Sequence, residues 1–270
     1  QRGLPAMKIY VRMLAALLLG YAAAGQVSGE AQAVNTTGKE PVQAELRYFC
    51  PVVSGSVGGK DYFSERTYEH KLDLRNDLGL EKAQAPEVKL IGPNWDVDFT
   101  RLRSTQDGQR LRAPITYKNH TYKGNLDTDM DMECLSVNWH QPIKSSERME
   151  IWWSAGAKYV RLHARSTGFN ASNRAESDED SASGILPAVG AGAHWFLGQG
   201  RRWQAAVSVN GMPLGGHGHI GDLEAELSWL PSAQWKLAAG WRFLDMELHR
   251  DDKNASYQAQ GPFFSIGCSF

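Results

Sequence analysis

Acidic side chains recur at every second position in two segments of this sequence. The first segment carries Asp127, Asp129, Asp131 and Glu133, and the second carries Asp222, Glu224 and Glu226. Because successive side chains of a β-strand point to opposite faces, carboxylates at this spacing would share one face of each strand. A wall of carboxylates can conduct cations or form ion pairs with Lys and Arg. Both chemistries need strands that bring the acids together.

A glycine-rich stretch at 215–219 carries two histidines. His217 and His219 are followed by Asp222. An imidazole beside a carboxylate can act as a general base, and two imidazoles at this spacing can bind a metal ion. We expect a polar external loop here, with catalysis and metal binding as the alternatives. The sequence contains no zinc motif or nucleotide-binding loop, so no metal or cofactor is predicted.

The residues between the acids have the two-residue period of a β-strand. Apolar and polar residues alternate over 220–229 and again over 235–243. The short cluster at 231–234 indicates a turn, so the two segments are predicted to form a hairpin. In the register that this hairpin implies, Asp222 lies opposite Arg242. The charges then meet on one face and the apolar residues on the other.

We predict an all-β protein with ten strands. Their approximate ranges are 42–50, 86–91, 95–104, 126–139, 149–166, 185–197, 202–210, 219–230, 234–248 and 256–270. If the first two do not join the sheet, the number falls to eight. Near Cys134 the apolar residues change phase, since Leu135, Val137 and Trp139 become the apolar set. A β-bulge would explain this change.

Short and long connections alternate between the predicted strands. The short ones are 92–94, 141–148, 198–201 and 231–234, and the long ones are 51–85, 105–125, 167–184, 211–218 and 249–255. A soluble sandwich is the alternative for such strands. However, the alternation is typical of outer-membrane barrels, which have short periplasmic turns and longer external loops.

Tryptophan placement favours the barrel. Of the nine Trp residues, all but Trp241 lie near a short connection, and these are Trp95, Trp139, Trp152, Trp153, Trp195, Trp203, Trp229 and Trp235. The short connections of antiparallel strands share one rim. These rings are therefore predicted to form an aromatic girdle at one membrane interface.

Charge and hydropathy exclude other classes. The chain has 29 Lys and Arg against 30 Asp and Glu, a net charge of −1. This balance argues against nucleic-acid binding, which normally needs a basic excess. The mean hydropathy of −0.43 argues against a membrane protein built from several helices.

The N-terminal region has the pattern of a secretory signal peptide. Lys8 and Arg12 flank the start of an apolar run that reaches Ala24, and small residues continue to Ala33. We predict that residues 1–33 are a signal peptide with a short extension before Met7. Residues 34–41 are then a periplasmic linker, and residues 42–270 form the barrel.

The last predicted strand ends in an alternating pattern with a terminal Phe. Phe264, Ile266 and Phe270 share one of its faces. This pattern resembles the assembly signal of Gram-negative outer-membrane barrels, and residues 42–270 resemble the small, OmpA-like superfamily of these proteins. The resemblance implies an outer-membrane location and insertion by the barrel-insertion machinery. It also implies contact with outer-membrane lipids and lipopolysaccharide.

Side chains would fill the interior of a barrel of eight to ten strands. The charges predicted to point inward are Asp96, Asp98, Asp127, Asp129, Asp131, Glu133, Lys158, Asp222, Glu224, Glu226, Lys236 and Arg242. We expect a paired, hydrated network that leaves the lumen largely occluded. The expected function is structural, or surface interaction through the external loops with a ligand that the sequence does not specify.

Two other functions stay open. The acidic wall could line a narrow cation-permeable pore. A hydrolase at the external rim is the second alternative, because His217, His219 and Asp222 resemble half of the catalytic set of omptin-like proteases. Lipid A deacylases carry a His-x-Ser pattern, whereas His163 is followed by Ser only at position 166. The preferred expectation is therefore a protein without enzymatic activity.

Overall fold

The computed structural model describes residues 42–63, 66–110, 115–117, 120–170, 174–198, 200–213, 218–250 and 253–270. The regular elements within these ranges are β-strands, as predicted. This part of the chain contains no helix of the length and apolarity needed to cross a membrane. The predicted signal peptide at 1–33 and linker at 34–41 lie outside the described residues.

Ten antiparallel strands close into a barrel, which confirms the predicted fold class. In spatial order they are β1 (Gln43–Phe49), β4 (Ala85–Ile91), β5 (Trp95–Arg110), β7 (His120–Ser145), β8 (Met149–Asn170), β9 (Ala175–Leu197), β10 (Trp203–Pro213), β11 (Gly218–Trp229), β12 (Trp235–Arg250) and β13 (Lys253–Ser269). Pairing of β1 with β13 closes the ring from Gln43–Ser269 to Phe49–Phe263. The first two predicted strands therefore belong to the barrel.

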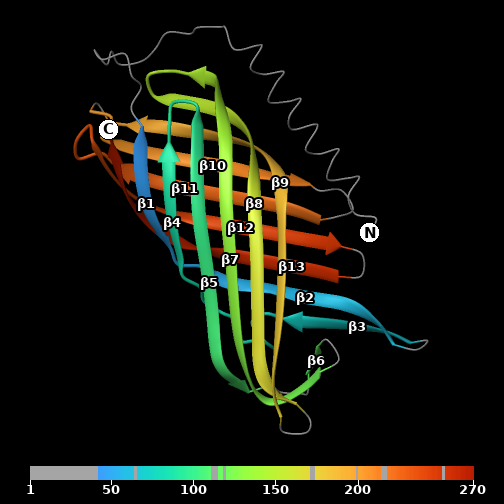
Figure 1. The fold of residues 1–270 in the computed structure, drawn as a ribbon. Helices are drawn as coiled ribbons and strands as arrows, with labels where there is room; N and C mark the ends of the chain where they lie inside the picture. Colours follow the sequence, from blue (N-terminus) through green and yellow to red (C-terminus); the bar gives the residue numbers. More distant parts are fainter. Residues whose placement is uncertain are drawn as a thin grey trace. The chain divides into compact units, whose positions relative to one another are not determined.

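Three further strands were not predicted. They are β2 (Val52–Phe63), β3 (Arg66–Asp73) and β6 (Ile115–Tyr117). β2 pairs with the external half of β13, whose other half pairs with β1. Pro51 separates β1 from β2, and its missing N–H suits such a break. β3 pairs with β2, and the two strands form a hairpin at the external end of this seam (Figure 1).

The external parts of β7, β8 and β9 are much longer than the sequence indicates. β8 and β9 pair without a shift in register from Met149–Trp195 to Phe169–Ala175, so most of the predicted loop at 167–184 is strand. Most of the predicted loops at 105–125 and 249–255 is also strand. Polar composition is typical of a loop, but a strand ribbon outside the membrane can also be polar on both faces. Figure 1 shows this extension beyond the shorter β10 and β11.

The outer wall carries the apolar side chains of the strands. Exposed examples from several strands are Leu46, Val88, Phe99, Val137, Val209 and Leu237. Toward the external side, exposed Arg101, Arg103 and Arg161 replace them on the same face. The apolar band is thus bounded by charge, as a barrel that spans a lipid layer requires.

Candidate functional site

Arg47 is the centre of an ion-pair network inside the barrel. Its Nη1 atom lies 2.5 Å from Glu224 Oε2 and 3.4 Å from Glu87 Oε1. Its Nη2 atom lies 3.2 Å from Glu45 Oε1 and 3.2 Å from Glu226 Oε2. The Arg47 side chain is 2% exposed. One guanidinium on β1 therefore joins β4 to β11 across the lumen.

A second guanidinium extends the network to the opposite strands. Arg242 donates from Nε to Asp222 Oδ1 at 3.0 Å and from Nη2 to Asp222 Oδ2 at 2.7 Å. Arg242 also contacts Glu87, and Lys158 Nζ donates to Asp222 Oδ2 at 2.7 Å. Asp222 thus accepts from two cations on different strands. Bidentate geometry of this kind gives the strongest ion pairs.

Lys236 adds two further bonds at the periplasmic side of Arg47. Its Nζ atom lies 2.6 Å from Glu226 Oε1 and 3.0 Å from Glu45 Oε2. Each of these carboxylates also contacts Arg47. A removed cation would therefore leave buried acids without full compensation, which is costly in a low-dielectric interior.

The charges that were predicted to point inward divide into two groups. Asp96, Asp98, Lys158, Asp222, Glu224, Glu226, Lys236 and Arg242 are buried or half-buried on the lumen side. The sequence reading missed inward charges on β1 and β4, which are Glu45, Arg47, Glu87 and Lys89. The signal for them was present, because apolar Leu46 and Tyr48 alternate with Glu45 and Arg47 just as on the later strands.

The acids of β7 do not face the lumen. Asp127, Asp129, Asp131 and Glu133 lie on the outer face, and the predicted bulge near Cys134 is wrong because the pairing on both sides of β7 is continuous there. Asp131 is bound by the exposed Arg101 in a bidentate pair, from Nε to Oδ1 and from Nη2 to Oδ2. The other face of the strand is buried and carries Thr128, Met130, Met132 and Cys134.

These acids follow Leu135, the last apolar residue of the outer face of β7, toward the external end of the strand. There the polarity of the two faces is exchanged without a change in register. In the sequence, this exchange looks like a shift by one residue in the alternation of apolar and polar positions, which is why a bulge was expected near Cys134.

A hydrophobic cluster fills the external half of the lumen. Its members include Leu102, Leu126, Met130, Met132, Val160, Ile220, Leu244, Met246, Tyr257 and Ala259. Phe49 and Phe263, which are opposite each other on β1 and β13, belong to this cluster and lie next to the ion pairs. The Arg47 guanidinium lies 4.1 Å above the Phe263 ring, a distance suited to a cation–π contact.

A segment between β3 and β4 contributes to this cluster. Leu74, Leu78 and Leu80 are 2%, 8% and 1% exposed. The segment is fastened to β2 by a bond from Val53 N to Glu81 O at 2.8 Å. Reciprocal 2.9 Å bonds between Gln84 and Arg103 fasten it to β5. The leucines of residues 74–84 therefore pack against the lumen-facing residues of the barrel, a contact that the sequence did not reveal.

The position of Trp152 contradicts its predicted place in the aromatic girdle. It lies on the lumen face of β8, 4.7 Å edge-to-face from the His140 ring and 6.2 Å from the His194 ring. His140 contacts Asp96, which also accepts from Asn138 Nδ2 at 2.8 Å. Because adjacent residues of a strand point to opposite faces, Trp152 and its neighbour Trp153 cannot both face lipid.

The other predicted girdle residues lie on the outer face. They are Trp95, Trp139, Trp153, Trp195, Trp203, Trp229 and Trp235. Trp203 and Trp229 are opposite each other, with stacked rings 6.2 Å apart. Their position at a membrane interface stays a prediction.

The predicted assembly signal also lies outside. Phe264, Ile266 and Phe270 are 60%, 45% and 76% exposed on the outer face. Backbone bonds between Phe270 and Val42 hold the chain end at the seam. Recognition of this signal by the insertion machinery stays a prediction.

The structure does not bring His219 of the stretch at 215–219 together with Asp222. His217 lies outside the described residues. His219 points outward, with Nε2 2.8 Å from Asp245 Oδ2 and Nδ1 3.4 Å from Glu247 Oε2. The expected neighbour Asp222 points inward to Lys158 and Arg242. Asp222 and His219 lie three residues apart on β11, and an odd spacing places them on opposite faces.

These features define the class of the protein. A closed antiparallel barrel with an apolar outer band and a charged, filled interior is a small outer-membrane β-barrel. The location that the sequence predicts, the outer membrane of a Gram-negative bacterium, agrees with this class.

Comparison with solved structures finds neighbours of low sequence identity. The outer-membrane protease OmpT of Escherichia coli is 9% identical over 88% of this chain and 99% of that chain, with a TM-score of 0.47. Ail, the attachment invasion locus protein of Yersinia pestis, is 10% identical over 84% and 99%, with a TM-score of 0.29. The toluene transporter TodX of Pseudomonas putida is 8% identical over 84% and 89%, with a TM-score of 0.35. No protein-family model and no curated protein matches the sequence.

Proposed function

We propose that this protein is a non-conducting barrel that presents its external strands for interaction at the cell surface. The observation that carries the proposal is the filling of the lumen at two successive levels. Ion pairs of Arg47 and Arg242 cross the middle, and the apolar cluster with residues 74–84 follows on the external side. A lumen closed twice favours a role outside the barrel over transport.

The external extension supplies a surface for such a role. β8 and β9 stay paired to Phe169 and Ala175, well beyond the apolar band. The outer side of this ribbon is polar, with a bond from Arg165 Nε to Ser177 Oγ at 3.2 Å and one between Thr167 Oγ1 and Ser177 Oγ at 3.2 Å. A paired ribbon holds its side chains in fixed positions and suits recognition better than a loop.

Conductance tests the first half of the proposal. The purified protein is inserted into planar lipid bilayers, with a general porin as the positive control. We expect no current steps, because Arg47, Arg242, Lys158 and Lys236 form ion pairs inside the barrel and the apolar layer excludes hydrated ions. Regular steps in the wild-type protein would overturn the non-conducting barrel and favour the cation pore.

Shortening the extension tests the second half. His163 and Ser181 are opposite each other, so a two-residue turn between them removes the tip of the ribbon and keeps the register. Binding of expressing cells to immobilised extracellular-matrix proteins and glycans is compared with and without the tip. We expect binding that depends on the tip, while the heat-dependent shift in gel mobility shows an intact barrel. Binding that is the same in both variants would contradict the proposal.

One observation supports a rim-sited hydrolase as a second candidate. His219 is bonded to Asp245 at 2.8 Å, the pairing that orients a general base. Cleavage of a panel of fluorogenic peptides, abolished by His219→Ala, would favour the hydrolase. Absence of cleavage by the folded wild-type protein would count against it.

A further inference from the structure

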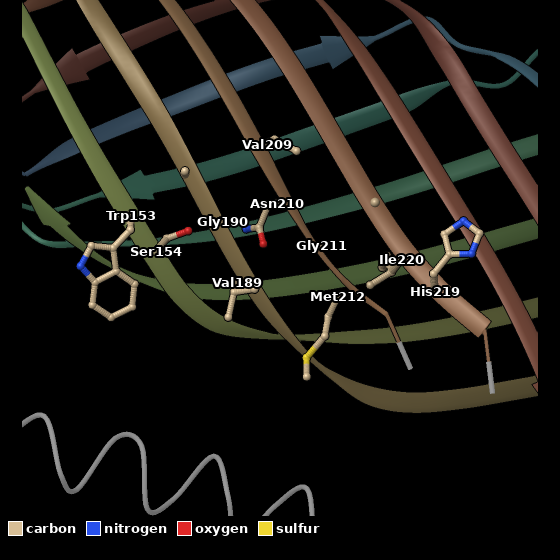
Figure 2. Close-up of a pocket in the computed structure, with 12 residues that line it drawn as sticks. Trp153, Ser154, Val189, Gly190, Val209, Asn210, Gly211, Met212, His219 and Ile220 are labelled. Atoms are coloured by element: carbon tan, nitrogen blue, oxygen red, sulfur yellow. The ribbon is translucent and has the colours of Figure 1, made fainter. Parts of the chain in front are cut away.

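A groove opens in the outer wall of the barrel where β9 and β10 separate. Their pairing ends at Gly211 and Val189, after which β9 continues beside β8 alone within the described residues. The groove has a volume of about 530 Å³. In the view of Figure 2, Trp153 and His219 lie at its two ends, with Val189 and Met212 between them.

The groove joins the lipid-facing surface to the interior. Trp153, Val189 and Val209 belong to the outer wall. Ile220 also lines the groove, and it is part of the buried cluster that fills the external lumen. An occupant would therefore touch protein on more than one side. The apolar side chains of an empty groove lack the dispersion contacts that an occupant would make with them. Packing of matching shapes is what drives association inside a bilayer.

The height of the groove places it in the outer leaflet. A strand rises about 3.3 Å per residue and is tilted by about 40° in such barrels, which gives about 2.5 Å of height per residue. Val209 is six residues beyond Trp203, or about 15 Å above the tryptophan rim. His219 is ten residues beyond Trp229, or about 25 Å, the height of the whole apolar band.

The upper end of the groove is polar. His219 is bonded to Asp245, whose Oδ1 atom accepts from Gln258 Nε2 at 3.4 Å. Gln258 Oε1 in turn accepts from Ser54 Oγ at 3.5 Å. This row of polar side chains crosses β11, β12, β13 and β2 at one level. It marks the depth at which lipid headgroups begin, so only the hydrocarbon part of a lipid fits below it.

We propose that this groove binds an acyl chain of lipopolysaccharide, the lipid of the outer leaflet. The groove is continuous with the apolar band that faces lipid, it lies in the outer half of that band, and it ends at the headgroup level. This site is independent of the proposed surface interaction, which uses the external ribbon.

Photo-crosslinking in intact cells tests the proposal. A benzophenone amino acid replaces Val209 in the groove or Trp241 on β12, and crosslinks are detected by immunoblotting for lipopolysaccharide. Trp241 is six residues beyond Trp235 and 52% exposed, so it matches Val209 in height and in access to lipid. We expect a severalfold stronger crosslink from position 209. Equal yields at the two positions would overturn the groove, and phospholipid as the main product at 209 would overturn the outer-leaflet assignment.

A variant whose side chain fills the groove provides a second test of the proposal. A Cβ added to Gly221 would meet nothing closer than Asp245 O at 4.0 Å, so Gly221→Leu can occupy the groove without a backbone clash. Ala225→Leu adds the same side chain on the same face of β11, outside the groove. We expect Gly221→Leu to lower the crosslink from position 209 to the level of position 241, and Ala225→Leu to leave it unchanged. An unchanged yield in a correctly inserted Gly221→Leu protein would overturn the proposal; the comparison of positions 209 and 241 stands without this variant.

Discussion

In the half of the lumen nearer the short turns the side chains that meet are charged, whereas in the external half they are apolar. On β12 the lumen face carries Lys236 and Arg242 and then changes to Leu244 and Met246. The outer face of the same strand changes in the opposite sense, with Asp245 following the last apolar residue. The change occurs at a similar level on β11, where Ile220 is buried and His219 points outward.

The environment of the outer wall explains this exchange. Where the wall faces lipid, its outer residues must be apolar, and the charges of the strand can only be accommodated inside as pairs. Where the wall faces water, the outer side can be polar, and apolar residues fill the interior as in a soluble protein. The two halves are thus stabilised by different forces, and substitutions should distinguish them.

The largest expected effect is in the charged half. Arg242→Met leaves Glu87 and Asp222 buried with too few cations, and we expect the free energy of unfolding to fall by about 3–5 kcal/mol. Unfolding in urea of protein refolded into lipid vesicles, followed by the gel-mobility shift, measures the change. Arg101→Met on the outer wall is the matched control and should change stability little, because exposed pairs contribute little. Equal losses in both variants would mean that the network does not hold the wall together.

In the apolar half a smaller loss is expected. Leu80→Ala removes a side chain that is 1% exposed and leaves a cavity, so the loss should be about 3 kcal/mol. Leu135→Ala, on the lipid-facing wall and 40% exposed, serves as the control and should lose less. The same urea titration applies. A Leu80→Ala protein as stable as Leu135→Ala would show that residues 74–84 are not packed into the lumen.

The same contrast explains what the sequence could predict. Alternation identifies strands and their partners wherever one face stays apolar over a long stretch, as over 223–229 on β11 and 235–243 on β12. The register is less certain, because the structure pairs Glu224, and not Asp222, with Arg242. Alternation cannot tell which face is inside once the solvent outside the wall changes from lipid to water. Asp131 and Arg101 were therefore assigned to the wrong side or overlooked, although the strands that carry them were predicted.

Residues 74–84 were missed for another reason. Their contacts are with strands far apart in the sequence, and three leucines in a polar connection carry no periodic signal. Trp152 was misplaced because nearness to a short turn gives height along the barrel and not direction.

Substitution of an acid on the outer face should have almost no effect on conductance or stability. Asp131→Asn weakens the exposed pair with Arg101 and leaves the interior unchanged, so neither conductance nor stability should change measurably. Asp222→Asn is the contrasting variant, because its carboxylate accepts from Lys158 and Arg242 inside the barrel. It should lower the midpoint of unfolding clearly. If Asp131→Asn altered bilayer current, these acids would have to line a conducting path after all.

A small effect of the opposite sign is expected for a polar atom in the apolar half. Tyr257 is 3% exposed, and its hydroxyl has no hydrogen-bond partner among the described residues. Tyr257→Phe removes this oxygen and keeps the ring, so stability at neutral pH should be unchanged or higher by up to about 1 kcal/mol. Tyr257→Ala, which removes the ring as well, should lose about 3–5 kcal/mol. A clear loss in Tyr257→Phe would show that the hydroxyl is bonded.

Alkaline titration sharpens the same test, because burial raises the pKa of Tyr257. Tyr257 lies opposite Met246, above the apolar band of the wall. In the unfolded chain a tyrosine loses its proton at a pKa of about 10. The folded protein keeps the proton to higher pH, so the unfolded state binds fewer protons and stability must fall as the pH rises through that value. The wild-type protein should therefore lose more stability than Tyr257→Phe between neutral pH and strongly alkaline pH. Parallel pH profiles of the two proteins would mean that this ring is open to water, and that the external half of the lumen is less dry than its packing indicates.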